Sequence, residues 1–462
     1  MGISAVTIAV VTIYLAATFY IGWRGRTLAS QGDMFNLFGR RAGTVRAASG
    51  YLSLIGGGEL ITICQLGYDN GIDVFAFLGG IAAGFLFLAL FSERVRLIAA
   101  KRGVTTFAGY FNDQYGLSAS IAITIVFLLS LGSLLSIQFI VGSQLINAIT
   151  GVPQELAALV MGAIILAYLL AAGYVAVLST DILRAVFMSV VLLVITGFLF
   201  FNFDHLPSDT AFTPLSNQDR VTFFLLGMFA VICAGDVWQT VFASQNRSVA
   251  SRSLLAGAAC FLVFGGLIAF IGVATKGALP TLGPDAPALI EATRSVIPGV
   301  LSPLMGLLIV GSVMATADTE IWVISTSLLS SKLPSEARYR AEAGSGSAFH
   351  SRLAKLTRFV LPIVTAMALL LAYLTRDAQA LYQGMLVQLI AIAPVVFLAM
   401  FITLSRVSVA LGLWFGLCCF VALFVAYRAE IPADLTFVPP AISLAGVVIG
   451  EMISRFARPV RT

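Results

Sequence analysis

The sequence is poor in charged residues. Asp, Glu, Lys and Arg make up 11% of its 462 residues, whereas hydrophobic residues make up 59% and the mean hydropathy is +0.99. Soluble globular domains contain about 25% charged residues. The composition therefore excludes a soluble fold of two or three domains and predicts a chain that lies mostly within a lipid bilayer.

Histidine and cysteine are also scarce. The two histidines, His205 and His350, fall in predicted loops, and the five cysteines fall in apolar stretches without metal-ligand spacing. We therefore expect no transition-metal site. The sequence contains no P-loop, nucleophile elbow or HExxH motif, so we expect no cofactor and no enzymatic activity.

Long apolar stretches make up most of the chain. A membrane-spanning helix needs about 20 apolar residues, and about thirteen stretches meet this length. The predicted fold is an all-α integral membrane protein with spans at 3–22, 45–68, 72–93, 117–147, 155–173, 176–202, 221–243, 253–275, 299–330, 357–374, 379–403, 407–427 and 435–455.

Arginine and lysine predict the orientation of these spans. Of the 27 Lys and Arg residues, only Arg220, Lys276, Arg294, Arg376 and Arg428 fall in one set of alternate loops. Cytoplasmic loops carry the excess of positive charge, so we expect the N-terminus outside, the C-terminus inside and an odd number of spans. This distribution explains the net charge of +5 without nucleic acid. It predicts a multi-pass protein of the plasma membrane or the bacterial inner membrane.

Two spans contain residues that weaken a helix. The second span contains the triplet Gly56–Gly58 directly before Glu59, and the seventh contains Gly235 and Asp236. Each glycine costs about 1 kcal/mol relative to alanine within a helix. Unwound backbone at membrane depth is tolerated only where it faces protein or a water-filled cavity. Because the two broken spans are five spans apart, they predict inverted five-helix repeats around a binding site at the bilayer midplane.

The predicted organisation has four parts. They are a leading helix and cytoplasmic loop at 1–43, a first repeat at 44–219, a second, inverted repeat at 220–404, and two trailing helices with a cytoplasmic tail at 405–462. The polar segment 332–358 is predicted to form a flexible cytoplasmic loop.

Four segments resemble a known family. They are QFIVGSQLINAITGVP (138–153), AAGYVAVLSTDILRAVFM (171–188), DVWQTVFASQNRSVASR (236–252) and VGSVMATADTEIWVISTSLLSSKL (310–333). In this order they resemble segments of the sodium/solute symporter family. The resemblance implies a LeuT-type inverted-repeat fold, cation coupling and alternating access, but a fold does not determine the solute or the ion.

The resemblance also implies a principal sodium site. Its ligands would be the carbonyls of Gly56, Glu59 and Ser312 and the side chains at positions 315 and 316. Hard cations prefer oxygen ligands, and the family places two adjacent hydroxyl residues at the last two positions. This chain has Ala315 and Thr316 there, so one ligand oxygen is missing.

Carboxylates near these positions form a second candidate site for a cation or a proton. Asp181 matches an acidic residue of the family, and Asp318 and Thr319 fall where some members place hydroxyls of a second sodium site. An ionised carboxylate in the membrane interior is costly unless it is paired. Arg184, three residues after Asp181, could provide a purely structural partner. Glu59 could bind a proton, a cation or an amino group of the solute.

The space between the broken spans is expected to hold the solute. Candidate contacts are Gly57, Gly58, Thr62, Gln65, Gln138, Asp236, Trp238, Gln239 and Gln388. The glutamines could instead form interhelical hydrogen bonds, and Trp238 could be a packing residue. The acidic and amide groups favour a neutral or amino-bearing small organic solute over a polyanion.

The first hypothesis is therefore a secondary active symporter in which entry of Na⁺ drives uptake of a small organic solute. Coupling to H⁺ through Glu59, Asp181 or Asp318 is the alternative. A membrane solute sensor without net transport is an alternative of another class. The expected partners are the solute, a monovalent cation and the lipid bilayer, without an obligate protein partner.

Overall fold

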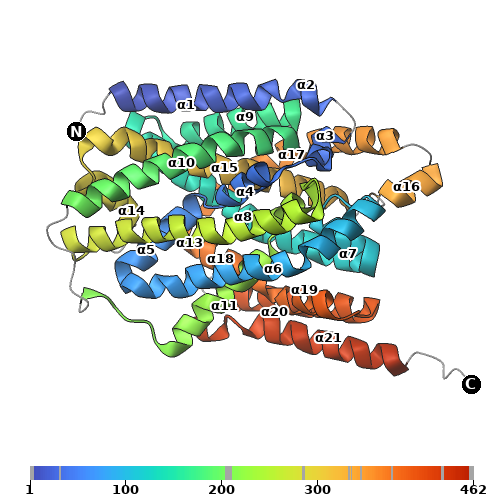
Figure 1. Ribbon diagram of the computed structural model, residues 1–462. Helices are drawn as coiled ribbons and strands as arrows, with labels where there is room; N and C mark the ends of the chain where they lie inside the picture. Colours follow the sequence, from blue (N-terminus) through green and yellow to red (C-terminus); the bar gives the residue numbers. More distant parts are fainter. Residues whose placement is uncertain are drawn as a thin grey trace, which may run out of the picture.

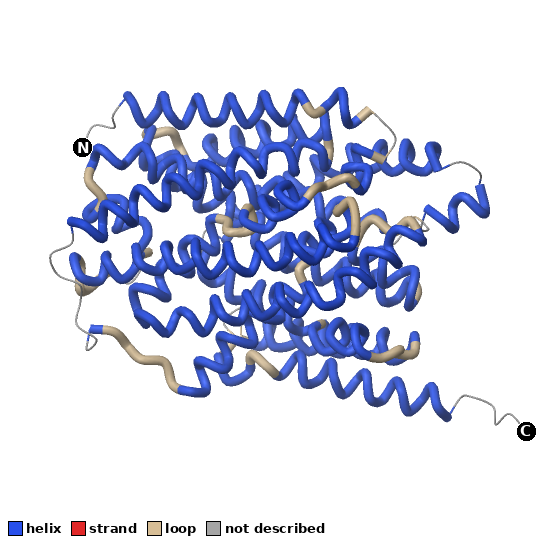
Figure 2. The backbone as a smooth tube through the Cα atoms, in the orientation of Figure 1, coloured by secondary structure: helices blue, strands red, loops and turns tan. Residues whose placement is uncertain are grey.

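The computed structural model describes residues 5–30, 33–202, 211–283, 287–330, 333, 336–343, 346–375, 378–427 and 431–456. Throughout these residues the chain forms helices joined by short connections (Figures 1 and 2). The predicted all-α fold is therefore confirmed for this part of the chain. Extended backbone pairs at one described place, between Ala42 and Ser244. His205, Arg376 and Arg428 lie outside the described residues.

The α-helices follow one another along the whole chain. They are α1 (Ala5–Arg24), α2 (Arg26–Ala29), α3 (Met34–Leu37), α4 (Thr44–Leu52), α5 (Gly57–Asn70), α6 (Phe75–Arg102), α7 (Phe107–Tyr115), α8 (Leu117–Thr150), α9 (Gln154–Ala172), α10 (Tyr174–Asn202), α11 (Asn217–Cys233), α12 (Gly235–Ala243), α13 (Arg247–Ala278), α14 (Ala288–Glu291), α15 (Ser302–Ser330), α16 (Glu336–Ala343), α17 (Gly346–Thr375), α18 (Ala378–Ala391), α19 (Ala393–Phe401), α20 (Arg406–Ala426) and α21 (Val438–Phe456).

Most of these helices have the length and composition of membrane spans. Within the described residues, 11 segments are long and apolar enough to cross a membrane, or up to 12 if the bent pair α11 and α12 forms one span. One of the 11 segments, Gly57–Arg102, contains both α5 and α6. The total of thirteen, the orientation of the termini and the four-part division stay predictions.

The helices surround a buried pair, α8 and α15. Helix α1 lies along one edge of the bundle against α9, α10 and α15, and α20 and α21 pack together at the opposite edge (Figure 1). Helices α8 and α15 contact each other inside the bundle. In the most apolar stretch of each of these two spans, more than 70% of the residues are buried. Their positions explain why polar side chains of both helices, such as Gln138 and Thr316, are buried.

The first predicted break lies at the start of the glycine triplet. Helix α4 ends at Leu52, the chain leaves the helix from Ser53 to Gly56, and α5 begins at Gly57. Gly57 and Gly58 are thus helical, and the first glycine alone belongs to the break. The helical glycines permit close packing, because a Cβ atom at Gly57 would lie 2.8 Å from Cγ2 of Val313.

The second predicted break is confirmed at the start of Gly235. Helix α11 ends at Cys233, Ala234 has extended backbone angles (φ −72°, ψ 114°), and α12 begins at Gly235. The axes of the two helices differ by 45°. A Cβ atom at Gly235 would lie 2.5 Å from the Phe127 ring, so this glycine also allows close contact.

The polar segment 332–358 is largely helical, so the prediction of a flexible loop is wrong for its described part. It contains α16 and the first turns of α17. His350 of α17 contacts α16 and the segment before α3: its Nε2 lies 3.3 Å from Glu336 Oε1, and its Nδ1 lies 3.2 Å from Asp33 Oδ1. Lys332 lies outside the described residues.

Candidate cation and solute site

The break between α4 and α5 faces two hydroxyl groups of α15. The Thr316 hydroxyl donates to the Ser53 carbonyl at 3.0 Å and lies 3.3 Å from the Ser312 carbonyl. The Ser312 hydroxyl donates to the Ile55 carbonyl. Carbonyl and hydroxyl oxygens therefore converge from two segments that are more than 250 residues apart in the sequence.

These carbonyls differ from those that the family resemblance implied. The Gly56 carbonyl accepts the Leu60 N–H at 2.9 Å, and Glu59 lies inside the first turn of α5. Gly56 is the N-cap of α5, and Glu59 belongs to the helix. The carbonyls that reach α15 are those of Ser53 and Ile55, because the chain leaves the helix before the glycines.

Side chains cap the start of α5. Gly56 N–H donates to Glu59 Oε2 at 3.1 Å, and Gly57 N–H donates to Gln138 Oε1 at 2.7 Å. Helix starts leave N–H groups without intrahelical partners, and these two side chains satisfy two of them. Nε2 of Gln138 has no hydrogen-bond partner among the described residues.

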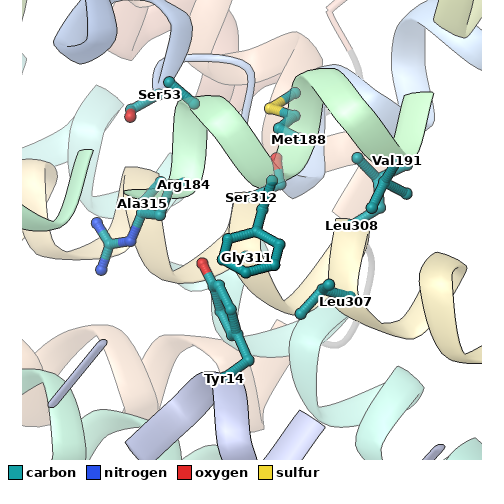
Figure 3. A pocket seen from close by; sticks show the side chains of 12 residues that line it. Tyr14, Ser53, Arg184, Met188, Val191, Leu307, Leu308, Gly311, Ser312 and Ala315 are labelled. Atoms are coloured by element: carbon teal, nitrogen blue, oxygen red, sulfur yellow. The ribbon is translucent and has the colours of Figure 1, made fainter. Parts of the chain in front are cut away.

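A small cavity lies beside the Thr316 contact, between α1, α10 and α15 (Figure 3). Ala315 and Ser312 line it from α15, Ser53 lines it from the break, and Arg184 lines it from α10. In Figure 3, Tyr14 of α1 directs its hydroxyl toward the middle of this space. The Ala315 methyl group thus occupies a position where a hydroxyl would add another oxygen to this region.

The second candidate site contains a buried arginine. Arg184 Nη1 lies 2.8 Å from Asp318 Oδ2 and 3.5 Å from Asp181 Oδ1. The Tyr168 hydroxyl donates to Asp318 Oδ2 at 2.7 Å, and Arg184 Nη2 donates to Tyr168 at 3.1 Å. The Thr319 hydroxyl donates to the Ala315 carbonyl of its own helix at 3.1 Å.

This arrangement matches the structural alternative for Asp181 and extends it to Asp318. One guanidinium serves two carboxylates, so the group keeps one excess negative charge when both carboxylates are ionised. A buried ion pair is costly to break because it leaves an uncompensated charge. The geometry therefore gives Arg184 a structural role, and one cation or proton could still balance the excess charge.

The structure brings only some of the predicted solute contacts together. Gly57 and Gly58 lie in the first turn of α5, against Val313 and the Tyr382 ring respectively, and Thr62 lies one turn later on α5. Gln138 reaches this turn from α8. Gln138 also lies beside Gly56, which faces the Thr316 hydroxyl of α15.

Other predicted contacts are held elsewhere by packing or hydrogen bonds. Trp238 donates from Nε1 to the Ile232 carbonyl at 2.9 Å, and its ring packs on Phe107 and Tyr110. Gln65 Nε2 donates to Asp69 at 3.0 Å, and its Oε1 accepts the Ala288 N–H. Both residues therefore have structural roles in this conformation.

The remaining candidates are buried acidic or amide residues. Asp236 begins α12 and accepts the N–H of Val237 at 2.7 Å. Both polar atoms of the Gln239 side chain, and Oε1 of Gln388, lack partners among the described residues. Unsatisfied buried groups are uncommon in native proteins, so each of these amides has capacity for a ligand or a water molecule.

Comparison with known proteins identifies the family. A model of the sodium:solute symporter family matches residues 35–416. The chain belongs to the sodium:solute symporter family. A symporter of this family is a multi-pass membrane transporter that couples a cation to a solute, which confirms the predicted class and the expectation of a transporter rather than an enzyme. No curated protein matches the sequence significantly.

Solved structures support the fold of the symporter. A Na⁺-coupled sialic acid symporter in a substrate-bound outward-open state aligns with a TM-score of 0.79 and 16% identity, over 98% of this chain and 97% of that one. MHP1, a nucleobase-cation-symport-1 family transporter in a closed conformation with bromovinylhydantoin bound, aligns with a TM-score of 0.60 and 14% identity, over 92% and 95%. At these identities the likeness shows the fold alone.

Sequence reasoning missed one acidic residue of the symporter. Glu320 lies on α15 and is completely buried (0% exposed). The available signal was its place in an apolar span, where an ionisable residue indicates function or a specific partner. Its spacing was a second signal, because Glu320 lies four residues after Thr316 on the same helical face.

Proposed function

We propose that the chain is a Na⁺-coupled symporter of a small organic solute that works by alternating access. In this proposal Na⁺ binds between the α4/α5 break and α15. The observation that carries the proposal is the convergence of the Ser53, Ile55 and Ser312 carbonyls with the Thr316 hydroxyl. A hydroxyl has acceptor lone pairs as well as its proton, so Thr316 can turn from donating to a carbonyl to binding a cation.

Such a site links ion binding to the movement of helices. Na⁺ would join α15 to the non-helical segment between α4 and α5, and would reduce the repulsion between the carbonyl oxygens there. The same segment leads into the capped start of α5, where the solute candidates Gly57, Gly58 and Gln138 lie. Na⁺ and solute are then expected to increase each other's affinity by the same factor.

Coupling to H⁺ is the second candidate. It is favoured by the excess negative charge of Asp181 and Asp318 over Arg184 and by the missing hydroxyl at Ala315. In this mechanism a proton on Glu59, Asp181 or Asp318 replaces Na⁺ as the coupling ion. A solute sensor would bind the same ligands without accumulating solute.

The first test measures thermal unfolding of the purified full-length protein in detergent, with NaCl or KCl at equal ionic strength. Na⁺ is expected to raise the unfolding temperature, because a ligand of the folded state stabilises it by mass action. Thr316→Val should abolish this shift. Thr326→Val is the matched control. Among the described residues, the Thr326 hydroxyl of the same helix bonds only its own helix, at 2.9 Å to the Trp322 carbonyl and 3.3 Å to the Val323 carbonyl. Equal shifts with Na⁺ and K⁺, or a Na⁺ shift that survives in Thr316→Val, would contradict the Na⁺ site.

A gain-of-affinity variant makes the same test sharper. Ala315→Ser restores the oxygen that is missing from the family pattern, and should lower the half-saturating Na⁺ concentration roughly tenfold if the new ligand contributes about 1.4 kcal/mol. Ala317→Ser, at another buried position of α15, should leave it unchanged. Proteoliposome uptake of labelled solutes under a Na⁺ or a pH gradient then distinguishes symport with Na⁺, symport with H⁺ and sensing.

A further inference from the structure

Glu320 is a buried carboxylate without a counterpart. Its side chain is 0% exposed, and neither carboxylate oxygen has a hydrogen-bond partner among the described residues. None of the ion pairs in the described part of the chain includes it. An isolated ionised carboxylate in an apolar interior costs several kcal/mol, so we expect Glu320 to be neutralised, either by a proton or by a cationic ligand.

Its position on α15 places Glu320 between the two broken spans. Ser312, Thr316 and Glu320 follow one another at intervals of four residues on one helical face, and the first two contact the α4/α5 break. Three residues after Glu320, Val323 packs at the start of α12, where a Cβ atom at Gly235 would lie 3.1 Å from it. Glu320 therefore faces the region where the solute of an inverted-repeat transporter binds.

Apart from Asp318, which pairs with Arg184, two further carboxylates lie within electrostatic range of Glu320. They are Glu59 in the first turn of α5 and Asp236 in the first turn of α12. Glu59 accepts one N–H from Gly56, and Asp236 accepts one from Val237. Arg184 is occupied by Asp318 and Asp181, so the three carboxylates have no cationic partner among the described ion pairs.

An aromatic ring lies beside the first turn of α5, which contains Glu59. A Cβ atom at Gly58 would lie 3.2 Å from Cδ2 of Tyr382, and the Tyr382 hydroxyl lies within electrostatic range of Glu59. The ring is buried next to the first turn of α5. Carboxylates next to an aromatic face are the groups that bind organic cations, through charge-assisted hydrogen bonds and cation–π contact.

We infer that the solute carries a cationic nitrogen group, a protonated amine or a guanidinium, and that Glu320 binds this group together with Glu59 and Asp236. The inference rests on the proposed solute transport and specifies the class of solute. An ammonium group has three donors and a guanidinium has five, which suits acceptors presented by three different helices. The Na⁺ position at Thr316 lies one helical turn away, so the two cations occupy separate places.

The test uses the purified full-length protein at fixed pH and ionic strength. Thermal unfolding is measured with agmatine, putrescine and phenethylamine, and with the uncharged analogues 1,4-butanediol and 2-phenylethanol. At least one amine is expected to raise the unfolding temperature by several degrees, while its uncharged analogue does not. In Glu320→Gln, the amine should no longer raise the unfolding temperature (the amine shift). Na⁺ should still raise it (the Na⁺ shift), because that effect depends on Thr316.

The control is Glu451→Gln, which removes a carboxylate of α21 that accepts the Ser405 N–H and the Ser408 hydroxyl. It should keep both shifts. Glu320→Gln is expected to unfold at the same temperature as the wild type or higher without ligand, because it removes an unpaired buried charge.

Three results would overturn the inference: no shift with any amine, an equal shift with the uncharged analogue, or an amine shift that persists in Glu320→Gln. Loss of the Na⁺ shift in Glu320→Gln, without any amine shift, would instead make Glu320 a ligand of the inorganic cation. An infrared carboxylic-acid band that is specific to Glu320, without any amine shift, would make the proton its ligand. The proposed Na⁺ site is tested separately. It would be wrong if Na⁺ still raised the unfolding temperature of Thr316→Val.

Discussion

The guanidinium of Arg184 lies 2.8 Å from the carboxylate of Asp318, with both side chains buried in the interior. Tyr168 joins the pair by hydrogen bonds to both residues, and Asp181 lies 3.5 Å from the same guanidinium nitrogen. This cluster connects α9, α10 and α15. It stands next to the cavity that also contains Ser53 and Ala315, so it supports one wall of the proposed Na⁺ site.

Removal of Arg184 is expected to destabilise the protein strongly. Arg184→Met leaves two buried carboxylates without their cation, and breaking a buried pair in this way costs about 3–5 kcal/mol. The comparison is Arg294→Met, which breaks the exposed pair of Arg294 with Glu291 at 3.1 Å. Exposed pairs contribute about 0–1 kcal/mol. Thermal or denaturant unfolding in detergent should show a marked loss for the first variant and little for the second; similar losses would contradict the structural role of Arg184.

Gly56 is expected to tolerate no side chain. A methyl group at Gly56 would overlap the Thr316 hydroxyl and lie 2.9 Å from Nε2 of Gln138. Overpacking of this kind costs about 1–3 kcal/mol, and displacement of Thr316 should also weaken the stabilisation by Na⁺. Gly132→Ala is the control, because nothing lies within 4 Å of a Cβ atom at Gly132. That change should be neutral or stabilise α8 by up to about 1 kcal/mol.

The measurement for Gly56→Ala is the unfolding temperature with and without Na⁺, together with proteoliposome uptake. If Gly56→Ala keeps the full Na⁺ shift, the Ser53 and Thr316 oxygens are not part of the cation site. Gly132→Ala should behave as the wild type in both assays.

The cluster of Asp33, Glu336 and His350 is expected to make stability depend on pH. The pKa of Glu336 is lowered from its ordinary value, first because His350 donates a hydrogen bond to its carboxylate. A lowered pKa in the folded state contributes stability above the unfolded pKa and loses it as the pH falls. The opposite sign holds for Asp33, whose pKa is raised by burial.

Glu336→Gln isolates the contribution of Glu336. The pair with His350 is complete between the ordinary pKa of glutamate, about 4.3, and that of histidine, about 6.5. The difference in unfolding temperature between wild type and Glu336→Gln should therefore be largest near pH 5–6 and shrink at lower pH. Glu93→Gln, at an exposed position of α6 without an ion pair in the described part of the chain, should show no such pH dependence. A difference that stays constant from pH 4 to 6 would contradict the pairing.

Several features of the molecule followed from local sequence properties. Apolar runs of about 20 residues identify membrane helices because the bilayer sets their length, and all-helical structure follows because backbone groups in lipid must be paired internally. Gly235 and the Gly56–Gly58 triplet marked both broken spans to within a few residues, since glycine weakens a helix wherever it occurs. The four segments between residues 138 and 333 indicated the family, because motifs of this kind are local and can be read without knowing the contacts of the folded chain.

The partners of the buried polar groups depended on tertiary structure. The carbonyls of Ser53 and Ile55, rather than those of Gly56 and Glu59, accept hydrogen bonds from Thr316 and Ser312, and these contacts join segments more than 250 residues apart. Trp238 was a solute candidate by position, yet its ring packs on α7. The sequence by itself determined the membrane class, the broken helices and the family; only the folded chain decided that Arg184 neutralises Asp318 while Glu320 has no partner among the described residues, because helices distant in sequence bring these charges together or keep them apart.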